Sequence, residues 1–194
     1  MTKPLIERPE PYDPLNYKNL AASVVEALMA QSPTNLPPPT PFEGVGVYAV
    51  YYRGDFEAYA SVKGIDIPIY VGSAVPAGKR KGRTEVPESQ RVLYGRLIQH
   101  AKSIEQAENL RLHDFMCRYL VVVPVWITLA ERFLIEHYRP VWNTVVEGFG
   151  NHDPGTGRRN MKRPRWDILH PGRSWAGHLQ PAETAEQVIA KLKP

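Results

Sequence analysis

The chain has 194 residues, of which 43% are hydrophobic and 23% are charged, which is ordinary for one globular domain with decorations. Its single cysteine, Cys117, excludes a disulfide within the chain and a cysteine-based zinc site. No apolar stretch approaches the ~20 residues needed to cross a bilayer, and the N-terminus lacks the apolar core of a signal peptide. We therefore expect a cytoplasmic protein with no membrane partner. The net charge of +4 is a mild excess and decides nothing by itself.

Residues 1–41 predict an N-terminal arm, a helix and a proline-rich linker. Prolines interrupt residues 1–14, and residues 16–31 then carry apolar side chains at the spacing of one helix face. Residues 32–41 are rich in proline and predict a stiff, extended linker that no helix can cross. The apolar stripe of the helix must pack on something. A neighbouring subunit and the chain's own core are both open alternatives.

Residues 42–145 predict the core of the protein. β-branched and aromatic residues favour strands, and apolar residues at helical spacing favour helices. Pro68 lacks a backbone donor and should stand at the start of its strand or on a sheet edge. The predicted elements form a compact α/β (α+β) core, in the order strand 44–52, strand 67–72, helix 91–108, strand 117–123 and helix 126–138.

Residues 146–194 predict a basic C-terminal extension with a short helix near 182–192. Basic residues crowd into two stretches of the chain, 79–83 and 158–165. Such clusters attract phosphate, although a solvated basic loop is as common an explanation for either one alone.

Two tyrosines stand beside glycines on the first two predicted strands. Tyr48 ends the triplet 46–48, and Tyr70 begins the triplet 70–72. Paired antiparallel strands can bring two phenols to one face, where they can hold a water molecule and a phosphate oxygen. Taken alone, the pattern is more typical of tyrosines that pack in a core.

Arg96 and His100 stand four residues apart on the first predicted core helix, which puts both side chains on one face. An arginine matches phosphate oxygens with a forked pair of donors, and a histidine can move a proton near neutral pH. A surface pair on an amphipathic helix is the alternative.

Glu131 is a candidate ligand for a hard divalent cation, because such ions prefer carboxylate oxygen. Two alternatives compete with this interpretation. Thr128 and Glu131 fit a capping box, in which the glutamate only closes a helix N-terminus. Glu136 is a second carboxylate on the same predicted helix.

The order Gly-x-Tyr, Tyr-x-Gly, Arg-x3-His and Glu-x8-Pro-x2-Asn resembles the signature of the GIY-YIG nuclease superfamily. It covers residues 44–143 and ends at Asn143, with valines in place of the family's isoleucines. The spacing from Glu131 to Asn143 favours Glu131 over Glu136. Within the superfamily, the chain most resembles the type II restriction enzymes, and most nearly the group that cuts CCGCGG. The likeness lies in the histidine four residues after the arginine, the long segment between the two strands and the sequence of residues 68–74.

The resemblance implies a small, mainly antiparallel, three-stranded sheet flanked by helices, and one Mg²⁺ ion per active site held by Glu131. Water would be the nucleophile. Tyr48 would act as general base assisted by His100, and which of the two finally takes the proton stays open. Tyr70 would orient water or phosphate, Arg96 would stabilise the developing charge, and Asn143 would anchor the site or the backbone around it.

The resemblance also implies partners: double-stranded DNA, a second copy in a homodimer, and a companion DNA methyltransferase acting on the same site. Arg53 and Lys63 could read bases, and the two basic stretches offer further DNA contacts. Most of these would touch phosphates only. The candidate DNA-binding residues of the basic stretches are Lys79, Arg80, Lys81, Arg83, Arg158, Arg159, Lys162, Arg163 and Arg165.

Three other functions compete with a restriction endonuclease. A structure-directed repair or mobile-element nuclease would share the same signature, but no helix-hairpin-helix or zinc module accompanies it. An inactive DNA-binding module would usually have lost the glutamate or the arginine. A histidine-metal nuclease would need clustered histidines, whereas those of this chain are scattered.

Overall fold

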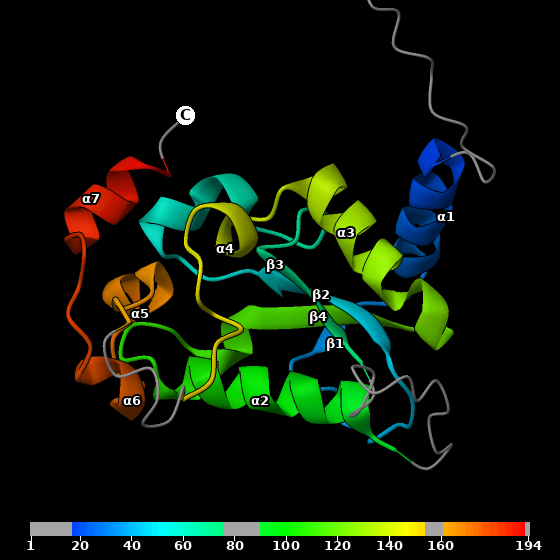
Figure 1. Ribbon diagram of the computed structural model, residues 1–194, viewed down its shortest axis with the longest axis horizontal. Helices are drawn as coiled ribbons and strands as arrows, with labels where there is room; N and C mark the ends of the chain where they lie inside the picture. The colour runs from blue at the N-terminus through cyan, green and yellow to red at the C-terminus, as the bar shows by residue number, and fades with distance from the viewer. Residues whose placement is uncertain (1–16, 76–89, 154–160, 193–194) are drawn as a thin grey trace, which may run out of the picture.

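The computed structural model describes residues 17–75, 90–153 and 161–192, and its centre is a four-stranded antiparallel sheet (Figure 1). The strands lie in the order β1-β4-β2-β3, so β1 and β3 are the edges. The mixed α+β class predicted from the sequence is therefore confirmed. The strands are β1 (Thr34–Asn35), β2 (Gly46–Tyr52), β3 (Tyr70–Ala74) and β4 (Phe115–Val121).

The prediction of three strands was wrong by one, because β1 forms inside the proline-rich segment 32–41. Thr34 pairs with Cys117 and Asn35 pairs with Met116 on β4. A pairing of two residues is too short to show the alternation that marks a strand in a sequence. The neighbouring Leu36 is buried, so this segment is part of the core and does not merely link two parts of the chain.

Strand β2 lies between β4 and β3, and every one of its residues is buried. Tyr48 and Val50 face the cluster formed with helix α2 (Val92–Gln106), whereas Val47 and Ala49 face helix α3 (Ile127–Tyr138). Helices therefore cover both faces of the sheet, with α2 on one side and α3 on the other (Figure 1). Because both faces of the sheet are covered, the side chains of β2 are buried on both sides of the strand.

Helix α1 (Tyr17–Met29) packs on its own chain, beside α3 and against β4 (Figure 1). Leu28 is fully buried there, in the cluster that contains Ile127 and Leu134. Of the two alternatives for the apolar stripe, the structure shows the chain's own core.

The C-terminal residues join the same core as the sheet. Trp142, Phe149 and Trp166 are fully or almost fully buried and belong to the cluster that contains Tyr48 and Leu97.

None of the described helices is both long and apolar enough to cross a membrane. The remaining helices are η1 (Glu57–Val62), η3 (Leu112–Asp114), η4 (Pro124–Trp126), α4 (Val141–Thr144), α5 (Arg165–Leu169), α6 (Ser174–Gly177) and α7 (Ala185–Ala190).

Candidate active site

Tyr48 and Tyr70 lie on one face of neighbouring strands. Tyr48 is opposite Gly72 in the β2–β3 register, and Tyr70 is opposite Val50. The two rings are therefore diagonal neighbours, with centroids 6.2 Å apart. A Cβ atom at Gly72 would lie 2.3 Å from the Tyr48 hydroxyl oxygen. The glycine of the Tyr-x-Gly triplet thus leaves the space that the Tyr48 phenol occupies.

Helix α2 brings Arg96 and His100 to these two tyrosines. The Tyr48 hydroxyl and His100 Nε2 are 2.5 Å apart, and both side chains are almost completely buried. The His100 ring also packs edge-on against Tyr70, with centroids 5.3 Å apart. Arg96 is only half-buried and stands between this buried pair and solvent. The helical spacing therefore delivers one buried proton acceptor and one accessible guanidinium to the same site.

The electrostatics of the site make both members of the Tyr48–His100 pair neutral. Burial raises the pKa of Tyr48 well above its ordinary value, and Tyr70 and Glu131 raise it further, against an opposing effect of Arg96. Burial also lowers the pKa of His100 well below its ordinary value, and the positive charge of Arg96 adds to this shift. The pair is therefore a protonated phenol hydrogen-bonded to a neutral imidazole.

Glu131 reaches the site from α3, on the opposite side of edge strand β3. Its carboxylate accepts a hydrogen bond from the Ser73 hydroxyl at 2.7 Å. Helix α3 begins at Ile127 after Trp126, with no side-chain cap, so Thr128 and Glu131 do not form the capping box. Glu136 is exposed and forms an ion pair with Arg132. Of the two carboxylates, Glu131 is therefore the one that contacts strand β3, which carries Tyr70.

Asn143 acts as a partner for the backbone of edge strand β3. Its side-chain oxygen accepts from the Val71 N–H at 2.8 Å, and its side-chain nitrogen donates to the Val71 carbonyl at 2.8 Å. Val71 lies between Tyr70 and Gly72, so these two bonds fix the strand position from which the Tyr70 side chain extends.

Residues beyond the signature complete the site. Phe149 stacks on the His100 ring with centroids 4.5 Å apart and an interplanar angle of 21°. The Gly150 carbonyl accepts a hydrogen bond from Arg96 at 3.0 Å, and the His152 ring also contacts the Arg96 guanidinium. Sequence reasoning missed this segment because a glycine-rich turn after a helix shows no periodicity. It likewise missed Ser73, although strand alternation alone places Ser73 on the face opposite to Tyr70.

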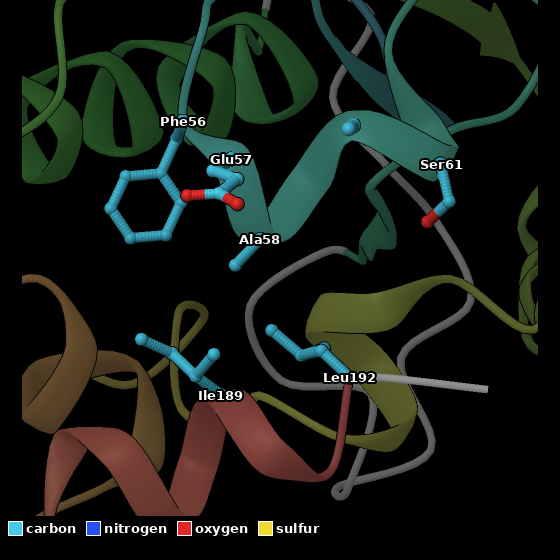
Figure 2. A pocket seen from close by; sticks show the side chains of 7 residues that line it. Phe56, Glu57, Ala58, Ser61, Ile189 and Leu192 are labelled. Carbon is cyan, nitrogen blue, oxygen red and sulfur yellow. The ribbon is translucent and has the colours of Figure 1, made fainter.

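An open depression of about 500 Å³ lies between β3 and the start of α2. Ser73, Arg91 and Arg96 are among its lining residues, so it adjoins the candidate site and carries two arginines. A second depression of about 470 Å³ lies between η1 and α7, where Phe56 and Ile189 approach from opposite sides (Figure 2). Its lining is mostly apolar and includes none of the predicted site residues.

The DNA-binding residues predicted from the two basic stretches fall into three groups. Arg163 donates to the carbonyls of Leu179 and Gly177, and Arg165 pairs with Glu183 at 2.7 Å, so both guanidinium groups are engaged within the chain. Lys162 is exposed. The other residues predicted from the two basic stretches lie outside the described residues, namely Lys79, Arg80, Lys81, Arg83, Arg158 and Arg159. Within residues 17–75, 90–153 and 161–192, no three His, Cys, Asp or Glu side chains gather as a metal site.

The structure brings a buried tyrosine–histidine pair, an arginine and one carboxylate together around an antiparallel sheet edge, which is the arrangement expected of the GIY-YIG nuclease class. A family model described as the Eco29kI GIY-YIG domain matches residues 40–193. The chain therefore belongs to this GIY-YIG family, and the recognition made from the sequence is confirmed. No curated protein matches the chain.

The family assigns the general activity of the protein. A GIY-YIG domain is an endonuclease domain, and DNA is the substrate that such a domain implies. The matched region extends through the C-terminal residues, which agrees with their packing against Tyr48 and His100. The extension predicted from the sequence is thus matched by the same family model as the catalytic signature.

Proposed function

We propose that this chain is a Mg²⁺-dependent type II restriction endonuclease that cuts a short GC-rich palindrome such as CCGCGG. The observation that carries the proposal is the Tyr48–His100 hydrogen bond, placed beside Arg96 and across edge strand β3 from Glu131. These groups can activate water, bind a phosphate and hold a cation, which are the three requirements of phosphodiester hydrolysis. The family match supports the choice of a restriction enzyme.

The residues at the site suit magnesium better than zinc. Mg²⁺ is usually held by one or two carboxylates together with waters and substrate phosphate, whereas zinc prefers histidine and cysteine. Glu131 supplies one carboxylate, and its hydrogen bond from Ser73 fixes the orientation of that carboxylate. When bound, the cation would polarise a phosphate oxygen as a Lewis acid.

The protein's own groups would activate the attacking water. The water oxygen forms a bond to phosphorus while one of its protons passes to the Tyr48 oxygen. The Tyr48 proton passes at the same time to His100 Nε2, 2.5 Å away. The phosphorus–oxygen bond to the leaving group then breaks, and solvent protonates the departing oxygen. Because the pKa of Tyr48 is raised, a free phenolate is not the base at neutral pH, and this relay avoids forming one.

Arg96 would bind the scissile phosphate and prepare His100 for its role. A guanidinium stabilises the charge that develops on phosphate oxygens in the transition state. In the free protein the positive charge of Arg96 lowers the pKa of His100. A phosphate bound to Arg96 would offset that charge, raise the pKa of His100 and make the imidazole a better proton acceptor.

The active unit would be a homodimer on its palindrome, and a companion DNA methyltransferase would protect the same sequence in the host. One GIY-YIG core supplies one site, and one site cuts one strand at a time. Cleavage of both strands at a fixed position then calls for two sites related by a twofold axis. Deleting helix α1 would not test this dimer, because the deletion would also remove Leu28 from the core of its own chain.

Digestion followed by end mapping tests the proposal. The purified chain would be incubated with Mg²⁺ and a plasmid of known sequence that carries CCGCGG sites. A second plasmid, in which one base pair of each site is changed, is the matched control. We expect double-strand breaks at one palindromic sequence, and none in excess EDTA. Cuts scattered over many sequences, or directed to branched DNA only, would favour a structure-directed nuclease instead.

Sedimentation tests the dimer separately from the cleavage. The chain bound to a short duplex with the mapped site should sediment as two copies per duplex. One copy per duplex at saturating protein would contradict the dimer and leave the endonuclease assignment standing.

A further inference from the structure

Arg173, in the C-terminal region, is the most densely bonded buried charge of the described residues. Its guanidinium forms a forked pair with Asp167, through bonds of 2.6 Å and 2.5 Å to the two carboxylate oxygens. Both side chains are almost fully buried. The guanidinium also lies over the rings of Trp166 and Trp175, at 4.5 Å and 4.8 Å from their centroids. Nothing in the GIY-YIG signature at 44–143 accounts for this arrangement.

The remaining donors of Arg173 all point to one backbone segment. They bond to the carbonyls of Gly148 at 3.0 Å, Phe149 at 3.1 Å and Asn151 at 3.0 Å. These carbonyls belong to residues 148–151, which form a turn and contain neither helix nor strand. The guanidinium of Arg173 therefore donates hydrogen bonds to three backbone carbonyls that no helix or strand would otherwise bond.

The clamped segment is the same one that touches the candidate active site. Between the bonded carbonyls of Phe149 and Asn151, the Gly150 carbonyl accepts a hydrogen bond from Arg96 instead, at 3.0 Å. The Phe149 ring stacks on His100. A Cβ atom at Gly150 would lie 2.6 Å from the Tyr70 hydroxyl oxygen, so the backbone itself lies against that phenol. Segment 148–152 thus forms a wall of the site.

We propose that Arg173 is a positioning residue for the nuclease site: with Asp167 it holds segment 148–152 as the wall against which Arg96 and His100 are set. The inference rests on the proposed function and adds a residue that lies outside the catalytic signature. Arg173 would touch neither DNA nor the cation, since it is buried behind the segment. Its effect on cleavage would pass through the Gly150 carbonyl to Arg96 and through the Phe149 ring to His100.

Lysine cannot replace Arg173 in this role. A lysine ammonium keeps the charge opposite Asp167, but it has three donors on one atom and cannot form the fork and reach three carbonyls at once. The segment would then be free to shift. A misplacement of about 1 Å at a reacting group can cost about 100-fold in rate, so we expect Arg173→Lys to slow cleavage about 10- to 100-fold.

Arg118 provides a matched control. It is also a buried arginine that donates to backbone carbonyls, those of Gln31 and Ile65, and its guanidinium lies 4.9 Å from the centroid of the Tyr51 ring. Its ring partner Tyr51 belongs to the core cluster on the α3 side of the sheet, whereas Phe149 belongs to the cluster on the α2 side. Arg118→Lys should lower the melting temperature as Arg173→Lys does, yet change the cleavage rate by no more than about twofold, as for independent sites.

The experiment compares the full-length wild-type chain, Arg173→Lys and Arg118→Lys under single-turnover conditions. The rate constant for cutting bound plasmid DNA in Mg²⁺ is measured beside the dissociation constant for the same DNA, well below each melting temperature. We expect a slower cleavage step for Arg173→Lys with a dissociation constant within about twofold of wild type. A purely structural role would leave the rate constant of the folded fraction unchanged.

A double-mutant cycle with Arg96→Ala tests the route of the effect. If Arg173 acts largely through Arg96, Arg173→Lys should slow the residual cleavage of Arg96→Ala much less than it slows the wild type. Equal slowing in both backgrounds would contradict that route.

Gly150→Ala keeps the inference testable if Arg173→Lys fails to fold. It adds one methyl group to the wall and leaves the Arg173–Asp167 pair intact, and we expect the same loss of cleavage rate without loss of DNA binding. Normal cleavage by Gly150→Ala, or by a folded Arg173→Lys, would overturn the positioning role alone. A wild-type chain that cuts no DNA in Mg²⁺ would overturn the proposed function, and the positioning role with it.

Discussion

Tyr48→Phe removes one hydroxyl group from the centre of the candidate site. The phenol is fully buried, and its hydroxyl lies 2.5 Å from His100 Nε2. Without it, His100 Nε2 loses its hydrogen-bond partner in a dry environment, which costs about 1–3 kcal/mol of stability. The catalytic loss should be larger. General-base catalysis contributes ~10²–10⁴-fold, or about 3–5 kcal/mol of transition-state stabilisation.

Tyr59 supplies a control of the same chemistry in the same protein. Its hydroxyl is also fully buried and lies 2.5 Å from a histidine Nε2, that of His170. This second pair belongs to a core network with Asn109 and lies outside the candidate site. Tyr59→Phe should therefore cost a similar folding free energy and leave the cleavage rate of the folded protein near that of the wild type.

The assay combines thermal unfolding with single-turnover cleavage of plasmid DNA. A domain of this size loses about 2–4 °C of melting temperature per kcal/mol, so both variants should melt a few degrees earlier. Only Tyr48→Phe should lose cleavage, by about 100-fold or more. A Tyr48→Phe variant that keeps more than about a tenth of the wild-type rate would refute Tyr48 as an essential base, and the tyrosine would then be a packing residue.

Three further predictions follow from contacts of the site and from the burial of two histidines. Ser73→Ala removes the hydrogen bond to the Glu131 carboxylate and should raise the Mg²⁺ concentration for half-maximal cleavage about 10- to 100-fold, and a metal titration that overlays the wild type would contradict it. Asn143→Ala leaves the N–H and C=O of one β3 residue without their partner; we expect a loss of about 1–3 kcal/mol in urea unfolding together with slower cleavage, and an unchanged midpoint would contradict the anchoring role. Burial lowers the pKa of His100 well below its ordinary 6.5 and that of His170 to about 3. Below about pH 6.5 the unfolded chain therefore binds these protons while the folded chain does not. Each histidine then decreases the free energy of unfolding by up to about 1.4 kcal/mol per unit of falling pH. Urea unfolding at pH 7.5 and 5.5 measures this loss, and equal stability at the two pH values would contradict it.

The part of the site that follows from regular geometry could be predicted from the sequence. Helical spacing placed Arg96 and His100 on one face, and strand alternation placed Tyr48 and Tyr70 on one side of the sheet. The ambiguous Glu131 needed the observed start of α3, since its fit to a capping box is equally good in the sequence.

The rest of the site depends on contacts that leave no periodic signal. A short strand such as β1 carries only two residues, too few for alternation to appear. Arginines look alike in a sequence whether they bind phosphate or backbone carbonyls, so Arg163, which donates to carbonyls of its own chain, was grouped with the predicted DNA contacts. Arg173 was passed over for the same reason. Its tryptophan neighbours, the buried Trp166 and the partly buried Trp175, are the feature that marks it as part of the core.

Metal-dependent DNA cleavage that requires Glu131 is the central claim, and one comparison tests it most directly. Wild type, Glu131→Gln and Glu136→Gln are incubated with the mapped plasmid across a range of Mg²⁺ concentrations, and DNA binding is measured separately in EDTA. Glu136 is the matched control because it stands on the same helix and pairs with Arg132 at the surface. We predict that Glu131→Gln binds DNA normally but cuts more than about 100-fold slower, while Glu136→Gln cuts normally. Normal cleavage by Glu131→Gln would contradict the account, and loss of cleavage in Glu136→Gln instead would move the metal ligand to that residue.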